Sequence, residues 1–508
     1  MLSKNIVLIA LLLSSVGINA GTLNSSETDQ MVLFKQNCAV CHGVDRLGIS
    51  GPALLPENLK RVRKKQAIES ITNGLPATQM PAFRGKLKAT EIKSLVDFIY
   101  TPLLEIPEWS EQSIAASHII YQPELVEGGA QSTSPIYDAD PLNVFLVVEA
   151  GDHHISVLNG DTFEIIHRFK SRYALHGGPK YTSDGRFVYL ASRDGWVTKY
   201  DMYNLQAVAE IRVGINARNL AVSGDNKYVL VGNYLPHTLI LLDATDLSLI
   251  KIIPVSDGAG NNSRVSAVYA AAPRQSFVVA LKDFKEVWEI RFDESSSTDV
   301  KPIVDRIQLD DYLDDFFFDQ QYDNIMGAAR NAKNGQVFNL SSQKKVADLD
   351  LTGMPHLGSG ITWAYNDTVV LATPNLKENT VTFIDTKNWK TIKKIETLGP
   401  GFFMRSHENS RYAWVDVFVG PNKDVMHIID KKTLEIVKTL KPMPGKTSGH
   451  VEFTRDGRFA LLSIWEMDGW LIVYDSETLE EVKRIPMNKP VGKYNVYNKI
   501  SRSSGTSH

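Results

Sequence analysis

Two cysteines and a histidine stand together in Cys38-Ala39-Val40-Cys41-His42, and the chain has no other cysteine. Thiols three positions apart form thioethers with the two vinyl groups of one haem, and the adjacent imidazole reaches the iron. A thioredoxin-like dithiol needs no histidine, and a zinc site needs a second pair of ligands. The spacing therefore predicts a covalent c-type haem (haem c) attached to Cys38 and Cys41, with His42 as an iron ligand.

The loop at residues 74–83 contains Met80, a candidate for the sixth ligand position of this iron. It lies between two segments that are typical of helices, residues 31–36 and residues 89–100. Together they predict a small all-α domain that closes over a haem. Met80 resembles the methionine ligand of bacterial class I cytochromes c, although a methionine in a proline-rich loop commonly serves packing alone. Ligation by histidine and methionine raises the haem potential and suits electron transfer.

Eight copies of one pattern follow: an apolar strand, an Asp or Asn, a short polar turn and a second strand. The marker residues of the copies are Asn159, Asp201, Asp243, Asp293, Asn339, Asp385, Asp430 and Asp475, which lie 42 to 50 residues apart. A period of this length with about four short strands per unit is typical of a β-propeller. The sequence therefore predicts an all-β propeller of eight blades.

The chain begins with Lys4, an apolar run at residues 6–13 and small residues that end at Ala20. This pattern predicts a secretory signal peptide over residues 1–20 and a periplasmic location. The alternative is a retained anchor, but the run is shorter than the roughly 20 residues that cross a bilayer. No later segment is apolar enough to cross, so we expect no stable membrane insertion.

We expect three further parts: a cytochrome c domain at residues 21–105, a linker rich in Pro, Glu, Ser and Gly at residues 106–137, and the propeller at residues 138–508. The formal net charge of −3 gives no reason to expect a nucleic acid partner. A propeller alone commonly serves as a scaffold for other proteins. The fused redox domain favours instead a ligand in the central channel with which electrons are exchanged.

The chain resembles the cytochrome cd1 family, in which a cytochrome c domain precedes an eight-bladed propeller that carries haem d1. Besides the haem c motif, the resemblance rests on DADPLNVF at residues 138–145, YALH at 173–176, GINAR at 214–218 and GKYNVYN at 492–498. It implies that His176 is the proximal ligand of the haem d1 iron. It also implies that Arg193 and Arg218 hold haem d1 carboxylates, for which guanidinium groups are suited.

The chain departs from the nitrite-reducing members of the family, which protonate nitrite with two distal histidines from the middle blades. It has no histidine between His237 and His356. The corresponding stretches read ALKDF at residues 280–284 and YLDDF at residues 312–316. Without these proton donors, we expect poor reduction of nitrite.

Other titratable groups stand on the late blades: His356, which has a counterpart in the reductases, His450, and Tyr494, where the reductases carry phenylalanine. This pattern is similar to the branch of the family that completes haem d1 synthesis as a dihydro-haem d1 dehydrogenase. That resemblance implies oxidation of one propionate of dihydro-haem d1 to the acrylate of haem d1. We expect His450 and Tyr494 to abstract a proton or hold the reacting carboxylate, and His356 to assist or to ligate the iron distally.

Haem c is then the exit for electrons, which pass one at a time to a periplasmic electron-accepting cytochrome. Hand-over of haem d1 to cytochrome cd1 nitrite reductase or to a haem d1 carrier is the expected next step. Two alternatives stay open: a nitrite reductase with unusual proton donors, and a non-catalytic carrier of haem d1. The missing histidines argue against the first, and haem c argues against the second because a carrier needs no electron exit.

Overall fold

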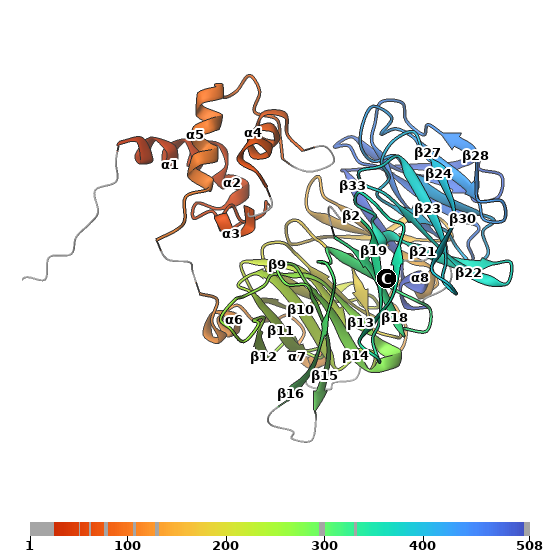
Figure 1. The fold of residues 1–508 in the computed structure, drawn as a ribbon, viewed down its shortest axis with the longest axis horizontal. Helices are drawn as coiled ribbons and strands as arrows, with labels where there is room; N and C mark the ends of the chain where they lie inside the picture. The colour runs from red at the N-terminus through yellow and green to blue at the C-terminus, as the bar shows by residue number, and fades with distance from the viewer. Residues whose placement is uncertain are drawn as a thin grey trace, which may run out of the picture.

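The computed structural model describes residues 25–49, 51–59, 62–75, 80–104, 108–126, 132–293, 300–329 and 333–501. The predicted signal peptide and residues 76–79 of the Met80 loop lie outside the described residues. A helical N-terminal domain lies to one side of a ring of β-sheets (Figure 1). In the parts of the chain that are described, none of the helices has the length and hydrophobicity that a membrane crossing requires.

The N-terminal domain is all-α, as predicted. Its helices are α1 (Ser25–Asn37), α2 (Ala39–His42), α3 (Pro56–Leu59), α4 (Lys64–Asn73) and α5 (Ala89–Ile99). The apolar face of α5 is buried, with Leu95 and Ile99 packed on Phe34 of α1 and with Ile92 packed on Ile71 of α4. This core holds the segment that carries the cysteine motif.

Eight sheets form the ring, which confirms the predicted propeller. From the inner strand outward, the first four are β33 (Pro490–Asn495), β2 (Val144–Glu149), β3 (His154–Asn159) and β4 (Ile165–Lys170); β5 (Lys180–Tyr181), β6 (Phe187–Ala191), β7 (Trp196–Asp201) and β8 (Gln206–Arg212); β9 (Asn216–Val222), β10 (Tyr228–Leu235), β11 (Thr238–Asp243) and β12 (Leu249–Pro254); β13 (Val265–Ala271), β14 (Ser276–Leu281), β15 (Glu286–Asp293) and β16 (Lys301–Gln308).

The other four blades have the same order of strands. They are β17 (Asp315–Phe318), β18 (Asn324–Ala328), β19 (Gly335–Asn339) and β20 (Lys344–Leu349); β21 (Ile361–Tyr365), β22 (Thr368–Pro374), β23 (Thr380–Asp385) and β24 (Lys390–Glu396); β25 (Met404–Arg405), β26 (Tyr412–Asp416), β27 (Met426–Asp430) and β28 (Glu435–Leu440); β29 (Ser448–Phe453), β30 (Phe459–Ile464), β31 (Gly469–Asp475) and β32 (Glu481–Met487). Short 3-10 turns lie at Pro141–Asn143, Ala272–Arg274 and Leu357–Ser359.

Each of the eight predicted Asp or Asn markers is the last residue of the third strand of a blade. In the seven of these turns that the structure describes, all but the one after Asp293, the marker side chain accepts a backbone hydrogen bond. Asp201 Oδ1, for example, accepts from the Tyr203 N–H at 2.8 Å, and Asp430 Oδ1 accepts from the Lys432 N–H at 2.8 Å. Short acidic and amide side chains favour such turns because they pair with the backbone two residues on.

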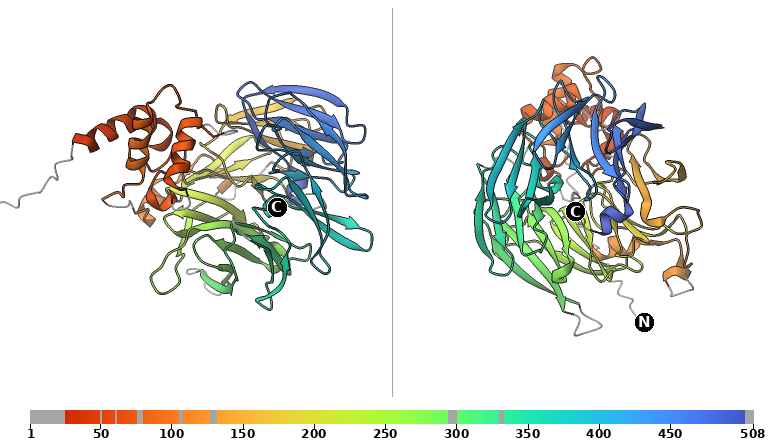
Figure 2. Two further views of the ribbon diagram at one scale, coloured as in Figure 1. Left: turned by 45° about the horizontal axis from the view of Figure 1, so that its top comes forward. Right: turned by 90° about the vertical axis from the view of Figure 1, so that its right-hand side faces the viewer.

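The last strand closes the ring. β33 pairs with β2, with Leu146 opposite Tyr494 and Val147 opposite Lys493, so the first blade contains both ends of the propeller sequence. This closure joins the two ends of the propeller sequence in one sheet. The following helix, α8 (Val496–Ile500), contacts the inner strands β33 and β5 and lies near the middle of the ring (Figure 2).

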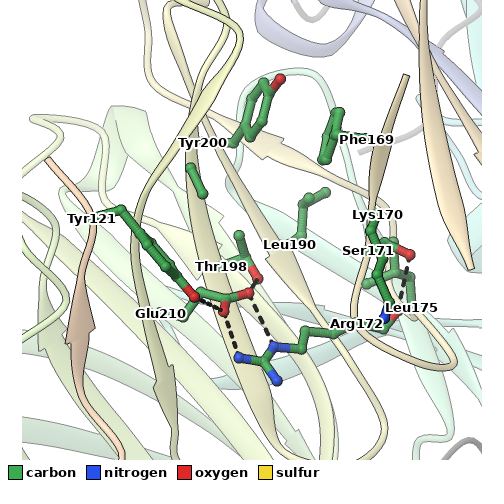
Figure 3. A pocket seen from close by; sticks show the side chains of 11 residues that line it. Tyr121, Phe169, Lys170, Ser171, Arg172, Leu175, Leu190, Thr198, Tyr200 and Glu210 are labelled. Atoms are coloured by element: carbon green, nitrogen blue, oxygen red, sulfur yellow. Dashed lines mark hydrogen bonds and ion pairs between the residues drawn. The ribbon is translucent and has the colours of Figure 1, made fainter. Parts of the chain in front are cut away.

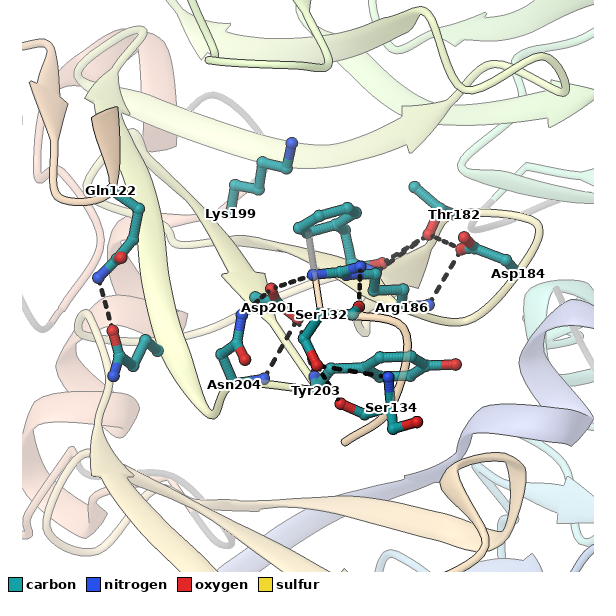
Figure 4. A network of polar contacts seen from close by, with 12 residues as sticks. Gln122, Ser132, Ser134, Thr182, Asp184, Arg186, Lys199, Asp201, Tyr203 and Asn204 are labelled. Atoms are coloured by element: carbon teal, nitrogen blue, oxygen red, sulfur yellow. Dashed lines mark hydrogen bonds and ion pairs between the residues drawn. The ribbon is translucent and has the colours of Figure 1, made fainter. Parts of the chain in front are cut away.

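The segment between the domains is more regular than its composition indicates. It forms α6 (Glu111–Ala116), β1 (Ile119–Ile120) and α7 (Pro123–Val126), and β1 adds a fifth strand to the second blade by pairing with β8. Ile114 of α6 is fully buried against that blade. Arg186 ties the end of the segment to the same blade, because its guanidinium donates to Ser132 O at 2.8 Å and to Asp201 at 3.0 Å (Figure 4).

The two domains also meet directly. Ala53 and Leu55 of the helical domain share an apolar cluster with Ile215 and Leu235 of the propeller. Ile215 immediately precedes the inner strand β9 and Leu235 ends β10, so both lie where inner strands begin. The helical domain therefore covers part of the face at which the inner strands enter the channel.

Candidate functional site

The cysteine motif is folded as a haem c site requires. Helix α2 begins after Cys38 and ends at His42, whose Nδ1 donates to Pro52 O at 2.8 Å. Burial lowers the pKa of His42, so the ring is neutral and Nε2 carries a lone pair for iron. A Cβ on Gly51 would lie 2.6 Å from this ring, which explains the glycine there.

The surroundings of the motif are apolar, as a macrocycle prefers. Cys38 packs against the cluster formed by Phe34 and Leu95, and its burial, with Cys41 next to it, raises the pKa of its thiol to about 11. Met80 packs against Ile71 and Phe83 in the second cluster of the domain. Its ligation of the haem iron stays a prediction.

His176 lies between β4 and β5, just before an inner strand of the channel. Its Nδ1 donates to Arg218 O at 2.7 Å, and its Nε2 accepts from the Arg218 guanidinium at 2.6 Å. Burial, with Arg193 and Arg218 nearby, lowers the pKa of His176 well below its ordinary value. The ring is thus neutral with an unprotonated Nε2, which is the form that ligates iron.

A cluster of cations surrounds Tyr234, a residue at the end of β10 that the sequence analysis missed. The side-chain cations of Arg193, Arg264 and Lys282 lie 5.4, 5.6 and 5.4 Å from the Tyr234 ring centre. Burial opposes ionisation of Tyr234, but Arg218, Lys282 and Arg193 outweigh it and lower its pKa to about 7. Tyrosine is common in strands, so the sequence around Tyr234 gives no indication of this role.

Two of these cations are neutralised and two are not. Lys282 pairs with Asp314 at 3.0 Å, and the Arg264 guanidinium pairs with Asp283 at 2.7 Å. Among the described residues, neither Arg193 nor Arg218 forms an ion pair with a carboxylate, and both side chains are partly buried. Such guanidinium groups are suited to bind the carboxylates of a ligand.

Residues of these ion pairs come from the stretches 280–284 and 312–316. These are the positions at which the nitrite-reducing members of the family carry distal histidines. Lys282 and Asp283 come from the first stretch and Asp314 from the second, and the neighbouring Asp315 accepts from the Tyr269 hydroxyl at 2.9 Å. The middle blades thus present charged groups that are already paired. They supply no imidazole to the channel.

Of the three predicted distal residues, His450 and Tyr494 come together, and His356 lies beyond two phenylalanines. His356 stacks on Phe402 with ring centres 4.1 Å apart, and its Nδ1 donates to Phe402 O at 2.7 Å. His450, on the inner strand β29, makes edge contacts with Phe403 at 4.8 Å and with Tyr494 at 5.2 Å. The two phenylalanines therefore separate His356 from His450.

Burial sets the protonation of these groups. It lowers the pKa of His356, and together with Lys493 it lowers that of His450 well below the ordinary value. Burial raises the pKa of Tyr494 to about 12. At neutral pH the channel therefore offers two neutral imidazoles, which can take up protons, and one phenol that keeps its proton.

A separate cavity of about 140 Å³ lies between the first and second blades, lined by residues of β4, β6, β7 and β8 (Figure 3). Leu175, the neighbour of His176, lines it together with Arg172 and Tyr121. Its charges are satisfied, because Glu210 accepts from Arg172 and, at 2.9 Å, from the Tyr121 hydroxyl. The cavity is smaller than the roughly 300 Å³ of even a small ligand pocket, so it is not a tetrapyrrole site.

A haem c motif lies on a small helical domain, and the propeller joined to it holds a ligand-type histidine and two arginines that no described carboxylate pairs with. Together these features define a cytochrome with a second tetrapyrrole site. Residues 139–499 match the family model for the cytochrome D1 heme domain, and residues 27–99 match that for cytochrome C oxidase, cbb3-type, subunit III. The chain belongs to the cytochrome D1 heme domain family.

Within this family the chain is 54% identical to the dihydro-heme d1 dehydrogenase of Pseudomonas aeruginosa, over 97% of this chain and 99% of that protein. A solved structure of dihydro-heme d1 dehydrogenase NirN in complex with DHE has a TM-score of 0.81 and 55% identity, covering 92% of this chain and 99% of that one. The nitrite reductase of Stutzerimonas stutzeri is 25% identical over 94% of each chain. These similarities confirm the predicted family and fold.

Proposed function

We propose that this protein is a dihydro-haem d1 dehydrogenase, which oxidises one propionate of its substrate to the acrylate of haem d1. The observation that carries the proposal is the neutral His450 in contact with Tyr494, in a propeller that also holds the neutral, ligand-type His176. The identity of 54% with a dehydrogenase of this name supports it. The paired charges at the middle-blade positions argue against nitrite reduction.

Substrate binding is assigned to the proximal half of the channel. His176 ligates the substrate iron through Nε2, and Arg193 and Arg218 bind carboxylates that are not oxidised. Tyr234 belongs to the same polar wall. His356 donates its Nδ1–H to a backbone carbonyl, as His176 does, and this suits it to be the second ligand of that iron.

Chemistry is assigned to the distal half. The change from –CH2–CH2– to –CH=CH– releases two protons and two electrons from the substrate. His450 takes up one of these protons from the side chain, and the Tyr494 hydroxyl holds the reacting carboxylate or relays that proton. The second proton leaves to solvent, and both electrons leave through haem c. Haem c, bound through Cys38, Cys41, His42 and Met80, supplies one-electron redox chemistry, so each turnover needs two transfers.

The proposed electron acceptor, location and recipient of the product follow from this chemistry. One haem c stores one electron, so a second cytochrome must accept electrons between transfers, and the predicted signal peptide puts that exchange in the periplasm. The product then passes to cytochrome cd1 nitrite reductase or to a haem d1 carrier.

The test adds dihydro-haem d1 anaerobically to the oxidised protein and follows haem c reduction together with the pigment. We expect two haem c groups to be reduced for each haem d1 formed, because each holds one electron. His450→Ala should bind the pigment with unchanged affinity and lose roughly 100-fold or more in rate. Tight binding without conversion by the wild-type protein would indicate a carrier, and turnover of nitrite would indicate a reductase.

A further inference from the structure

His356 lies in the loop between β20 and β21, outside any strand, so contacts with other segments must fix its position. The His356 N–H donates to Pro374 O at 3.0 Å. The Leu376 N–H in turn donates to Met354 O at 2.9 Å. The loop is therefore paired with the segment that follows β22, and Asn375 lies at the centre of this contact.

The Asn375 side chain uses both ends of its amide on this contact, and it is only 4% exposed. Its Oδ1 accepts from the N–H groups of Met354, Lys377 and Glu378 at 3.2, 2.9 and 3.1 Å. Its Nδ2 donates to Thr352 O at 2.8 Å. Only a side-chain amide supplies an oxygen acceptor and an NH2 donor from one planar group. The residue type thus matches the partners around it.

The loop comes close to this amide at Gly353. Its φ is +74°, and a Cβ there would lie 3.0 Å from Asn375 Oδ1. A left-handed conformation with so little room for a side chain favours glycine. The loop is therefore shaped to fit against the Asn375 amide.

Asn375 also holds the segment that packs on the His356 ring. Its carbonyl oxygen accepts from the Gly401 N–H at 3.0 Å, and Gly401 directly precedes Phe402. Phe402 stacks on His356 and accepts its Nδ1–H. The fully buried Asp416 fixes the same segment, because its Oδ1 accepts from the Phe402 N–H at 2.7 Å. One asparagine thus ties the loop that carries His356 to the segment that orients its ring.

The His356 ring that is held in this way lies near the proximal part of the site. Burial lowers the pKa of His356, Asp315 opposes this shift, and Arg218 adds to it from nearby. The guanidinium of Arg218 also donates to His176. The two histidines therefore border one polar region, as two ligands of one iron must.

We propose that Asn375 is a positioning residue that holds His356 where it ligates the iron of the bound tetrapyrrole. This inference rests on the proposed dehydrogenase function, in which His356 is the second ligand of the substrate iron. A ligand that is already in place needs no ordering when the tetrapyrrole binds, so binding is tighter. Without the Asn375 amide, the loop should adopt conformations in which His356 no longer reaches the iron.

The test compares Asn375→Ala with Asn324→Ala in the complex with dihydro-haem d1. Asn324 begins β18 in the fifth blade, and its amide likewise donates to Asp319, at 2.6 Å, and accepts from Asn339, at 3.1 Å. Absorption and electron paramagnetic resonance spectra of the ferric complex report the ligands of the iron. We expect two imidazoles to give low-spin iron in the wild type and in Asn324→Ala. About half or more of the iron in Asn375→Ala should be high-spin, as in His356→Ala.

Two additions distinguish a displaced loop from a general loss of structure. Added imidazole should restore the low-spin spectrum of Asn375→Ala, because it takes the place of the displaced ring. The Kd for dihydro-haem d1 should rise about 3- to 10-fold in this variant. Asn375→Asp, which keeps the oxygen acceptor, should retain most of the low-spin iron.

If Asn375→Ala fails to fold, Gly353→Ala tests the same contact from the side of the loop. Its methyl group would press on Asn375 Oδ1, and the same spectral change is expected. Low-spin iron in both variants, or high-spin iron in the wild-type complex, would overturn the inference. Absence of conversion by the wild-type protein would instead refute the proposed function, while the spectra still test how His356 is held.

Discussion

The hydrogen bond at Nδ1 distinguishes the histidines of this protein from one another. His42, His176 and His356 each donate Nδ1–H to a backbone carbonyl, at 2.8, 2.7 and 2.7 Å. All three therefore present an unprotonated Nε2, as iron ligands do. In His450 the Nδ1 atom faces the amine of Lys493 instead. Among these four histidines, the partner at Nδ1 thus separates those that suit ligation from the one that suits proton transfer.

Tyr234 gives a prediction at the same scale. Because its pKa lies at about 7, it is mostly neutral at pH 6 and mostly ionised at pH 8. The negative phenolate then offsets the cations of Arg193 and Arg218, so substrate carboxylates are held less tightly. We expect the Kd for dihydro-haem d1, measured by absorption titration, to rise about 3- to 10-fold from pH 6 to pH 8.

The variant Tyr234→Phe should abolish this rise, since phenylalanine cannot ionise. Tyr269→Phe is the matched control, because burial and Asp315 raise the pKa of Tyr269 well above its ordinary value. That variant should keep the pH dependence of the wild type. The same dependence in Tyr234→Phe would show that another group titrates.

At the scale of elements, a fully buried residue anchors the segment between the domains. Ile114 of α6 lies in the core shared by the second and third blades, whereas Ile119 of β1 is 36% exposed. Ile114→Ala should lower the free energy of unfolding of the propeller by about 2–4 kcal/mol, because it leaves a cavity. Ile119→Ala should cost less than about 1 kcal/mol. Urea unfolding of the two variants checks this, and equal losses would contradict it.

Elements with a local sequence signal were predictable, and those formed by distant segments were not. The eight Asp and Asn markers were predictable because each ends the third strand of its blade at a local turn signal, and the helix at 89–100 was predictable from its apolar spacing. Strand β1 has two residues, and its partner β8 is far away in sequence, so no local pattern predicts β1. Tyr234 and Asn375 were missed for the same reason: their roles arise from neighbours that are distant in sequence.

At the scale of the whole molecule, the helical domain packs where the inner strands enter the channel. Leu55 is buried at this contact, whereas Leu104 is fully exposed. Leu55→Asp puts a charge into the apolar contact, which should loosen the domains and slow reduction of haem c by bound substrate about 10-fold or more. Stopped-flow absorption measures this rate. An unaltered haem c spectrum checks the fold, and Leu104→Asp should react like the wild type.

The closing strand has a consequence for the biogenesis of the protein. β33 completes the first blade and also carries Lys493 and Tyr494, so these two side chains reach the channel only when the two ends of the propeller sequence join. A chain that stops before residue 490 lacks the ring closure and half of the distal site at once. Unfinished or clipped copies should therefore be inactive, so the completed polypeptide is itself a condition for catalysis.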